Sequence, residues 1–221
     1  MDSQQSKFWD KEILNWEEGV YEKKSQSLLE KIANKFRGVL VERLELTVDL
    51  LTPLIKDKVV MDLGCASGLL CYQLLERGAK KVIGIDLAQS AITKANASFQ
   101  SRQIDPVRYQ FLCQEVGQAD QPLPSADFVV GIGFIDYLDA QAMKKMLNSL
   151  TAPYFLFSFP EKVLSLREIA HIIYRRLTRC PSYKYSQEEF KQLVAETKFK
   201  DCYFWQKGII RFVHNIPELN K

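Results

Sequence analysis

Residues 59–70 combine the residue types that can hold a polar ligand close to the polypeptide backbone. They read VVMDLGCASGLL: an apolar run meets Asp62, and a loop of small residues follows between Gly64 and Gly68. Glycine has no side chain, so a ligand can approach its backbone closely. A second acid, Asp86, closes the apolar run VIGID 18 residues after Gly68. A carboxylate there can accept hydrogen bonds from both hydroxyls of a ribose, so the pattern predicts a nucleoside-binding site.

The spacing of the glycines separates two classes of nucleoside ligand. The dinucleotide fingerprint G-x-G-x-x-G, counted from Gly64, would need glycines where this chain has Ala66 and Leu69. The spacing Asp62-x-Gly64-x-Ala66-x-Gly68 instead resembles motif I of the class I S-adenosylmethionine-dependent methyltransferases, whose pattern tolerates small residues at position 66. The resemblance covers residues 58–160. It implies S-adenosylmethionine as the cofactor. On steric grounds, we expect that a branched side chain at Gly68 would either occupy cofactor space or force the loop open.

The same resemblance implies where each part of the cofactor lies. Asp62 matches an acid that supports the loop and the amino group of the ligand, and Leu87 matches a residue that packs on the adenine. Glu115 stands where the family more often has Asp beside the adenine amino group, and Gln114 is a rival for that role. Gly131, Ile132 and Gly133 match the stretch that lines the methionine part. The full set implied for cofactor binding is Asp62, Gly64, Cys65, Ala66, Gly68, Asp86, Leu87, Gln114, Glu115, Val116, Gly131 and Ile132.

Methyl transfer from a sulfonium is a direct displacement, so the protein mainly supplies alignment and a dry site. A general base is needed only where the acceptor carries a proton at the working pH. Asp136 and Tyr137, after the fourth strand, and His171, beyond the fifth, are the candidate catalytic residues. His214 is expected to be non-catalytic because the last strand runs away from the cofactor. Arg43 is a candidate partner for the cofactor carboxylate, with a solvated helix charge as the alternative.

Alternating strand and helix patterns predict that these residues lie along one edge of a parallel sheet. Strands are expected at 58–64, 80–88, 106–116, 126–138 and 153–160, and helices at 68–79, 90–102 and 139–152. A helix with a capping box from Ser186 to Glu189 precedes segments 200–206 and 209–216, which form a hairpin. The predicted fold class is α/β, with a doubly wound, mostly parallel, seven-stranded Rossmann-like sheet, a terminal antiparallel strand and an N-terminal helical segment.

The predicted organisation is a helical cap at 1–55 and a cofactor-binding domain at 56–221 with a helical insertion at about 161–185. The cap carries the aromatic residues Phe8, Trp9, Trp16 and Tyr21. Either Trp9, Leu14, Trp16 and Val20 form a core stripe, or the aromatic side chains cover a substrate. The insertion has one apolar and one basic face. Its basic face is either solvated or in contact with an acidic or phenolic substrate.

Composition excludes several other classes of protein. The chain has 221 residues, 47% hydrophobic and 26% charged, with a net charge of +3 that is too small for a nucleic-acid footprint. Its five cysteines form neither a CxxC pair nor a Cys/His cluster, which argues against zinc and against a disulfide framework. We expect a cytoplasmic protein with buried thiols, no metal, no signal peptide and no membrane span.

These observations favour methyl transfer from S-adenosylmethionine to a small-molecule acceptor, at oxygen rather than nitrogen. The segment GFIDYLD after the fourth strand lacks the N/D-P-P-Y/F pattern of the amino-nitrogen methyltransferases, and no RNA-binding module is visible. Two alternatives remain open at this point: a nicotinamide-dependent oxidoreductase and a non-catalytic nucleoside-binding protein.

Overall fold

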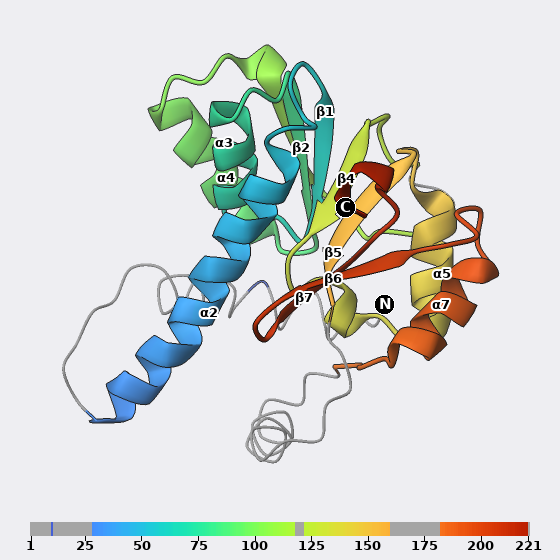
Figure 1. Ribbon diagram of the computed structural model, residues 1–221. Coiled ribbons are helices and arrows are strands. Elements are labelled where there is room, and N and C mark those ends of the chain that lie inside the picture. Colours follow the sequence, from blue (N-terminus) through green and yellow to red (C-terminus); the bar gives the residue numbers. More distant parts are fainter. Residues whose placement is uncertain (1–9, 11–27, 118–121, 160–181, 221) are drawn as a thin grey trace.

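The computed structural model describes residue 10 and residues 28–117, 122–159 and 182–220, and it contains a seven-stranded sheet (Figure 1). The strand order is β3-β2-β1-β4-β5-β7-β6, and β7 runs antiparallel to the other six strands of this sheet. The strands are β1 Val59–Leu63, β2 Lys81–Asp86, β3 Tyr109–Cys113, β4 Phe128–Gly131, β5 Tyr154–Ser158, β6 Tyr203–Lys207 and β7 Ile210–His214. The predicted fold class is confirmed. The last strand in sequence lies between β5 and β6, and β6 forms the edge.

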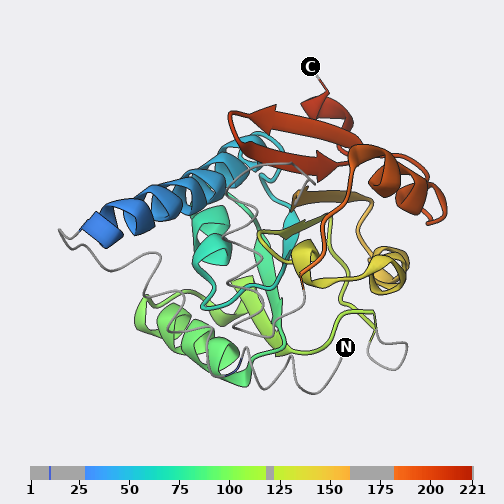
Figure 2. The ribbon, with the colours of Figure 1, turned by 90° about the horizontal axis from the view of Figure 1, so that it is seen from below.

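Helices cover both faces of the sheet, which makes a three-layer structure (Figure 2). The α-helices are α2 Leu28–Leu51, α3 Leu69–Glu76, α4 Gln89–Ser101, α5 Ala140–Ser149 and α7 Gln187–Ala195. The short 3-10 helices are η1 Pro106–Arg108, η2 Ile135–Tyr137 and η3 Pro217–Leu219. One core cluster joins α2, α3 and α4 to the sheet, and a second joins α5 and α7 to the opposite face. Because the central strands are buried on both faces, they read in the sequence as continuous apolar runs.

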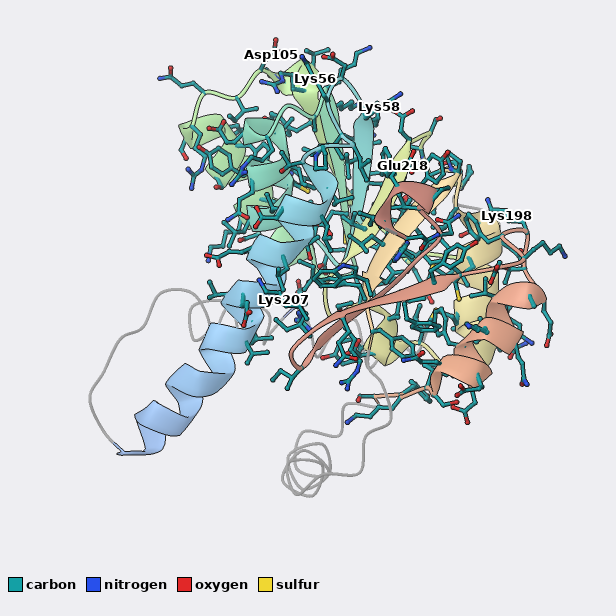
Figure 3. All side chains as sticks on the ribbon, in the orientation of Figure 1. Lys56, Lys58, Asp105, Lys198, Lys207 and Glu218 are labelled. Carbon is teal, nitrogen blue, oxygen red and sulfur yellow. The ribbon has the colours of Figure 1, made fainter. Side chains whose placement is uncertain are left out.

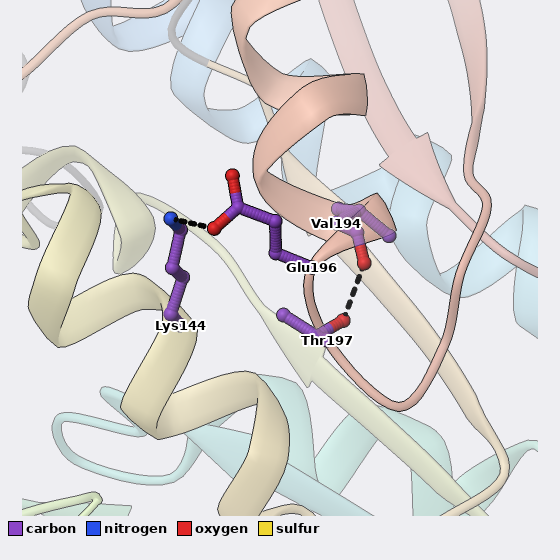
Figure 4. A network of polar contacts seen from close by, with 4 residues as sticks. All are labelled: Lys144, Val194, Glu196 and Thr197. Atoms are coloured by element: carbon purple, nitrogen blue, oxygen red, sulfur yellow. Dashed lines mark hydrogen bonds and ion pairs between the residues drawn. The ribbon is translucent and has the colours of Figure 1, made fainter.

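The outer helices begin at side-chain caps and are tied together by polar contacts. Asp139 caps α5 by accepting a hydrogen bond from the Ala142 amide, and Ser186 forms the predicted capping box with Glu189 at the start of α7. An ion pair between Lys144 and Glu196 links the two helices (Figure 4). In the same figure, the Thr197 hydroxyl donates to the Val194 carbonyl beyond the end of α7.

Two expected strands are shorter than predicted. Strand β4 ends at Gly131 instead of continuing to 138, because the chain turns at Gly133, which has a φ of +67°, and then forms η2. Residues Pro106–Arg108 form η1 instead of the start of a strand, since the Asp105 carboxylate accepts a hydrogen bond from the Val107 amide. Both differences place polar or small residues in turns at the ends of strands.

The parallel strands begin along one edge of the sheet and end along the opposite one, the carboxyl edge, and different parts of the chain lie at each (Figure 3). Lys56, Lys58 and Asp105 lie at the edge where β1 and β3 begin, while Lys207, at the tip of the β6–β7 hairpin, lies at the opposite edge. Strands β1 to β5 end at that opposite edge. In parallel α/β sheets this carboxyl edge is where ligands bind.

The predicted division at residue 55 and the helical insertion stay predictions. The C-terminal half of α2 contributes Leu44 and Leu51 to the same core cluster as β1. The cap aromatics and most of the insertion, including His171, lie outside the described residues. Within the described part of the chain, no helix is long and apolar enough to cross a membrane.

Candidate functional site

The loop after β1 folds across the carboxyl edge of the sheet. The amides of Gly64 and Cys65 both donate to the carbonyl of Ile85 on β2, at 2.8 and 3.1 Å. Gly64 and Gly68 have φ values of +73° and +81°, in the left-handed region that favours glycine. The loop closes with a 2.9 Å hydrogen bond from the Gly68 amide to the Cys65 carbonyl, directly before α3. Its backbone is therefore held tightly at the point where β1 and β2 end.

Asp86 holds this loop together with the start of α4. Its Oδ2 accepts a hydrogen bond from the Ala66 amide at 2.9 Å, and its Oδ1 accepts one from the Ala88 amide at 2.9 Å. Ala66 has a φ of +46°, so a non-glycine residue keeps the left-handed conformation at the middle of the loop. Burial raises the pKa of Asp86, and the amide hydrogen bonds oppose that rise. A carboxylate offers about four acceptor sites, so the backbone amides leave acceptor capacity for a ligand hydroxyl.

Gly68 is required by packing inside the protein itself. A Cβ at this position would lie 2.9 Å from Cζ of Phe111 and 3.2 Å from Cε2 of Phe99. Gly84 on β2 is crowded by the same ring, with Phe111 Cδ1 only 2.5 Å from the position of a Cβ. A side chain at Gly68 would therefore meet the aromatic cluster between α4 and β3, and the expectation that it would also occupy cofactor space stays a prediction.

Asp62 is buried beneath the loop, with 3% of its surface exposed. The thiol of Cys71 on α3 donates a long hydrogen bond to Oδ2 of Asp62, with 3.7 Å between the sulfur and the oxygen. Burial raises the pKa of Asp62 to about 7, and the nearby charge of Asp86 adds to the rise. Since the pKa is higher in the folded state, the stability contributed by this group is present at acidic pH and is lost as the pH rises from about 4 through 7.

The residues predicted to surround the adenine lie together at the ends of β2 and β3. Asp86 is opposite Cys113 in the parallel register, and the Gln114 amide donates to the Asp86 carbonyl at 2.9 Å. The Cys113 thiol lies 3.5 Å from the Leu87 carbonyl. Glu115 and Val116 follow directly and are partly buried. The structure thus brings Leu87 and residues 114–116 next to Asp86.

The end of β4 forms the second half of the site. A Cβ at Gly131 would lie 3.2 Å from the Leu63 carbonyl, so the chain leaving β4 passes close to the end of β1. Ile132 follows, and the Gly133 amide donates to the Ser158 hydroxyl at the end of β5, at 2.7 Å. The ring of Phe134 covers Gly64, with Cδ2 3.3 Å from the position of a Cβ. Residues 131–133 therefore face the loop that follows β1.

Arg43 reaches this second half from α2. Its Nη2 lies 3.2 Å from the position of a Cβ at Gly133, and its buried Nε has no hydrogen-bond partner among the described residues. Asp136, in η2, likewise has a buried Oδ1 that no described residue contacts by a hydrogen bond. Burial raises the pKa of Asp136, and the charges of Arg43 and Lys184 oppose the rise. A cation and an acid with unused buried polar atoms thus lie beside the end of β4.

Of the remaining residues considered in the sequence, Tyr137 lies beside Asp136 and His214 lies away from the site. Tyr137 is next to Asp136 in η2. The amide of Tyr183, near the end of the predicted insertion, donates to the Asp136 carbonyl at 2.6 Å, so Tyr183 lies beside η2. His214 pairs with Leu156 in the middle of β5 and is 1% exposed; its Nδ1 accepts from the Ile216 amide at 3.2 Å. Burial lowers the pKa of His214.

Comparison with known proteins identifies the arrangement. Residues 60–152 match the family model of a methyltransferase domain. Residues 60–152 therefore form a methyltransferase domain. Its fold is similar to that of magnesium protoporphyrin IX methyltransferase from Synechocystis with bound SAH, with a TM-score of 0.74 and 16% identity over 96% of this chain and 97% of that one.

Two curated sequence relatives of the methyltransferase domain act on different acceptors by name. A ribosomal protein L11 methyltransferase from Colwellia psychrerythraea is 38% identical over 34% of this chain and 24% of its own length. A ubiquinone biosynthesis O-methyltransferase from Idiomarina loihiensis is 37% identical over 43% of this chain and 39% of its own length. The alignments thus span roughly a quarter and two fifths of these relatives. The predicted family, enzyme class and cofactor are confirmed at the level of the domain, and the acceptor is not determined by it.

The described residues of the methyltransferase domain fit S-adenosylmethionine. The glycine loop leaves bare backbone at the edge, Asp86 keeps acceptor capacity for a hydroxyl, and Arg43, on α2, has a buried Nε without a hydrogen-bond partner among the described residues. In the described part of the chain, no group of three or more His, Cys, Asp or Glu residues is arranged to hold a metal ion.

Sequence reasoning missed several residues that shape the site. Phe134, Ser158 and Phe111 pack or hydrogen-bond against the glycines of both halves. Each is an ordinary apolar or hydroxyl residue, and no spacing marked it. Asp10, far away in sequence, binds the start of α4 and was also missed.

Proposed function

We propose that this methyltransferase domain transfers the methyl group of S-adenosylmethionine to an oxygen atom of a small-molecule acceptor. The observation that carries the proposal is the division of the carboxyl edge into two halves. One half holds a bare loop tied to Asp86, and the other holds Arg43 and Asp136 with buried polar atoms that no described residue uses. The first half suits a nucleoside, and the second suits a charged ligand group and a reacting proton.

In this proposal the first half binds the adenosine part of the cofactor. Asp86 accepts hydrogen bonds from the two ribose hydroxyls through the lone pairs that Ala66 and Ala88 leave free. Leu87 and residues 114–116 contact the adenine, and the packed glycine loop keeps this surface in place without the ligand. The adjacency of these residues at the ends of β2 and β3 supports the assignment.

The second half binds the methionine part and aligns the acceptor. Arg43 lies against Gly133, and a guanidinium with an unused donor there can bind the cofactor carboxylate. When bound, S-adenosylmethionine supplies an activated methyl group on its sulfonium. Asp136 accepts the proton of the acceptor hydroxyl as the oxygen takes up the methyl group, and Tyr137 and His171 are the other candidates for this role. The unpartnered Oδ1 of Asp136 supports its choice, because a general base needs a free acceptor within the site.

The proposal includes a cytoplasmic location and no nucleic-acid or membrane partner. Cys65, Cys71, Cys113 and Cys202 are free thiols, which supports a reducing compartment. The modest net charge of +3 supports a small acceptor over RNA.

Calorimetry followed by an acceptor screen tests the proposal. Titration with S-adenosylhomocysteine should release or absorb heat with saturation, while NAD should give none; binding of NAD alone would contradict the cofactor assignment. The screen should then include phenols, hydroxy acids, amines, ribosomal protein and tRNA, with S-adenosylhomocysteine release as the readout. Turnover only on a protein or RNA would refute the small-molecule acceptor. Cofactor binding with no turnover on any of them would favour a nucleoside-binding protein.

A further inference from the structure

Asp10 makes two hydrogen bonds to a residue 80 positions away in the sequence. Its Oδ1 accepts from the Ser90 amide at 2.8 Å, and its carbonyl accepts from the Ser90 hydroxyl at 2.7 Å. Ser90 lies in the first turn of α4. The N-cap residue of this helix is Ala88, whose methyl side chain cannot accept a hydrogen bond from the first amides. The first amides of a helix lack partners within the helix, so a carboxylate from elsewhere in the chain can replace the missing cap.

The location of this contact connects it to the adenosine half of the site. Ser90 is four residues beyond Asp86, and Ala88, between them, donates its amide to Asp86. The negative charge of Asp10 also acts on the thiol of Cys113, which is paired with Asp86 at the ends of β3 and β2. Asp10 therefore lies beside the same carboxyl edge as the proposed ribose ligand.

The turn between β2 and α4 is consequently held by two carboxylates. Asp86 binds the amide at position 88 from inside the sheet, and Asp10 binds the amide at position 90 from the N-terminal segment. The hydrogen bonds from Ser90 lower the pKa of Asp10, so the carboxylate stays charged at neutral pH and interacts favourably with the helix N-terminus.

We propose that Asp10 is a positioning residue for the cofactor: by capping α4 it fixes the 86–88 turn in the orientation that binds the adenosine part. This inference rests on the proposed function. It makes a residue of the N-terminal segment part of the cofactor-binding machinery, in addition to any contact of that segment with the acceptor. Asp10 acts through Ser90 and Asp86 and need not touch the ligand.

The test compares Asp10→Ala and Asp10→Asn with a matched variant, Asp105→Ala, in the full chain. Asp105 also accepts a hydrogen bond from a backbone amide at the start of a short helix, but at the opposite edge of the sheet. Affinities for S-adenosylhomocysteine and for methylthioadenosine, which lacks the amino-acid part, are measured by calorimetry. The ligand-free melting temperature of each variant is measured in parallel.

We expect Asp10→Ala to weaken both ligands by about three- to tenfold, the range set by the loss of a helix cap. Asp10→Asn retains an acceptor oxygen and should recover most of the affinity, while Asp105→Ala should leave both dissociation constants unchanged. Equal affinities for Asp10→Ala and the wild type, or equal losses in Asp10→Ala and Asp105→Ala, would overturn the inference. If the wild type itself binds neither ligand, the proposed function fails first, and the two failures are thereby distinguished.

Discussion

Asp86 and Asp136 are two acids at the same edge of the sheet, and their surroundings differ in one decisive way. Burial raises the pKa of both. Both oxygens of Asp86 accept a backbone amide, from Ala66 and Ala88. Oδ1 of Asp136 is buried without a hydrogen bond from any described residue, although Arg43 and Lys184 act on its charge.

The difference separates an acid that builds a surface from an acid that can react. A carboxylate whose oxygens are already held fixes the backbone around it and presents its remaining lone pairs in set directions. A buried acceptor without a partner is unfavourable by roughly 1–3 kcal/mol, and proteins keep such atoms mostly where a ligand or a reaction uses them. Substitutions at the two acids and at the residues around them test this division.

The largest effect is expected at Gly68, on the Asp86 side. Gly68→Val should lower the free energy of unfolding of the ligand-free protein by about 3 kcal/mol or more, because the new side chain meets Phe111 and Phe99 at a left-handed φ. Gly78→Val is the control, since Gly78 also has a positive φ but no atom within 4 Å of a Cβ. Chemical denaturation measures both; an equal loss in the two variants would mean that backbone strain, and not packing, dominates at Gly68.

Asp86→Ala should weaken S-adenosylhomocysteine by about a hundredfold, because two charge-assisted hydrogen bonds to the ribose are lost. The ligand-free melting temperature should also fall, since the Ala66 and Ala88 amides lose their acceptor. Asp127→Ala is a matched control: Asp127 accepts the Val59 amide at 2.8 Å at the opposite edge. It should lower stability alone. An affinity for Asp86→Ala within about threefold of the wild type would rule out the ribose assignment.

Asp136→Asn should reduce turnover by about tenfold or more while cofactor affinity stays within about threefold, the pattern of a lost general base. If Tyr137 or His171 is the base instead, Tyr137→Phe or His171→Ala should show this loss. His214→Ala should retain most of the turnover, because His214 lies in the middle of the sheet, away from the edge. A hundredfold loss in His214→Ala with normal cofactor binding would contradict this placement.

The pH dependence of turnover sharpens the same comparison. A base must be deprotonated to accept a proton, and burial raises the pKa of Asp136 above its ordinary value of 3.8. Turnover at saturating substrate should therefore rise with pH over a range above that value, and the rise should be absent in Asp136→Asn. A rise that persists in the variant would assign the ionisation to another group.

The smallest effect is expected from Arg43→Met, which separates the two halves of the site by ligand. It should weaken S-adenosylhomocysteine by about five- to tenfold through loss of one charge-assisted contact, and leave methylthioadenosine unaffected. Arg77→Met, at an exposed position with a 4.0 Å ion pair to Asp49, is the control and should change neither. Calorimetry with both ligands checks this. Equal weakening of the two ligands would show that Arg43 supports the fold and does not bind a carboxylate.

Local patterns in the sequence were enough to predict the order of the elements and the loop at the edge of the sheet. Apolar runs alternating with helical periodicity predicted the seven-stranded sheet, and the spacing from Asp62 to Gly68 with Asp86 predicted the loop at its edge. These signals survive in sequence because each element must bury its own face, and because the loop needs small residues in a fixed order. Strand ends were less accurate: β4 stops at Gly131, where the chain turns.

The contacts between distant residues at that edge became visible only in the folded chain. Nothing in the order of residues places Phe111 over Gly68, Arg43 against Gly133, or Asp10 at the start of α4. The position of β7 between β5 and β6 was likewise decided by pairing across the sheet. Such contacts depend on packing between elements that are far apart in sequence, and a single sequence carries periodicity and motif spacing but not the distances between its elements.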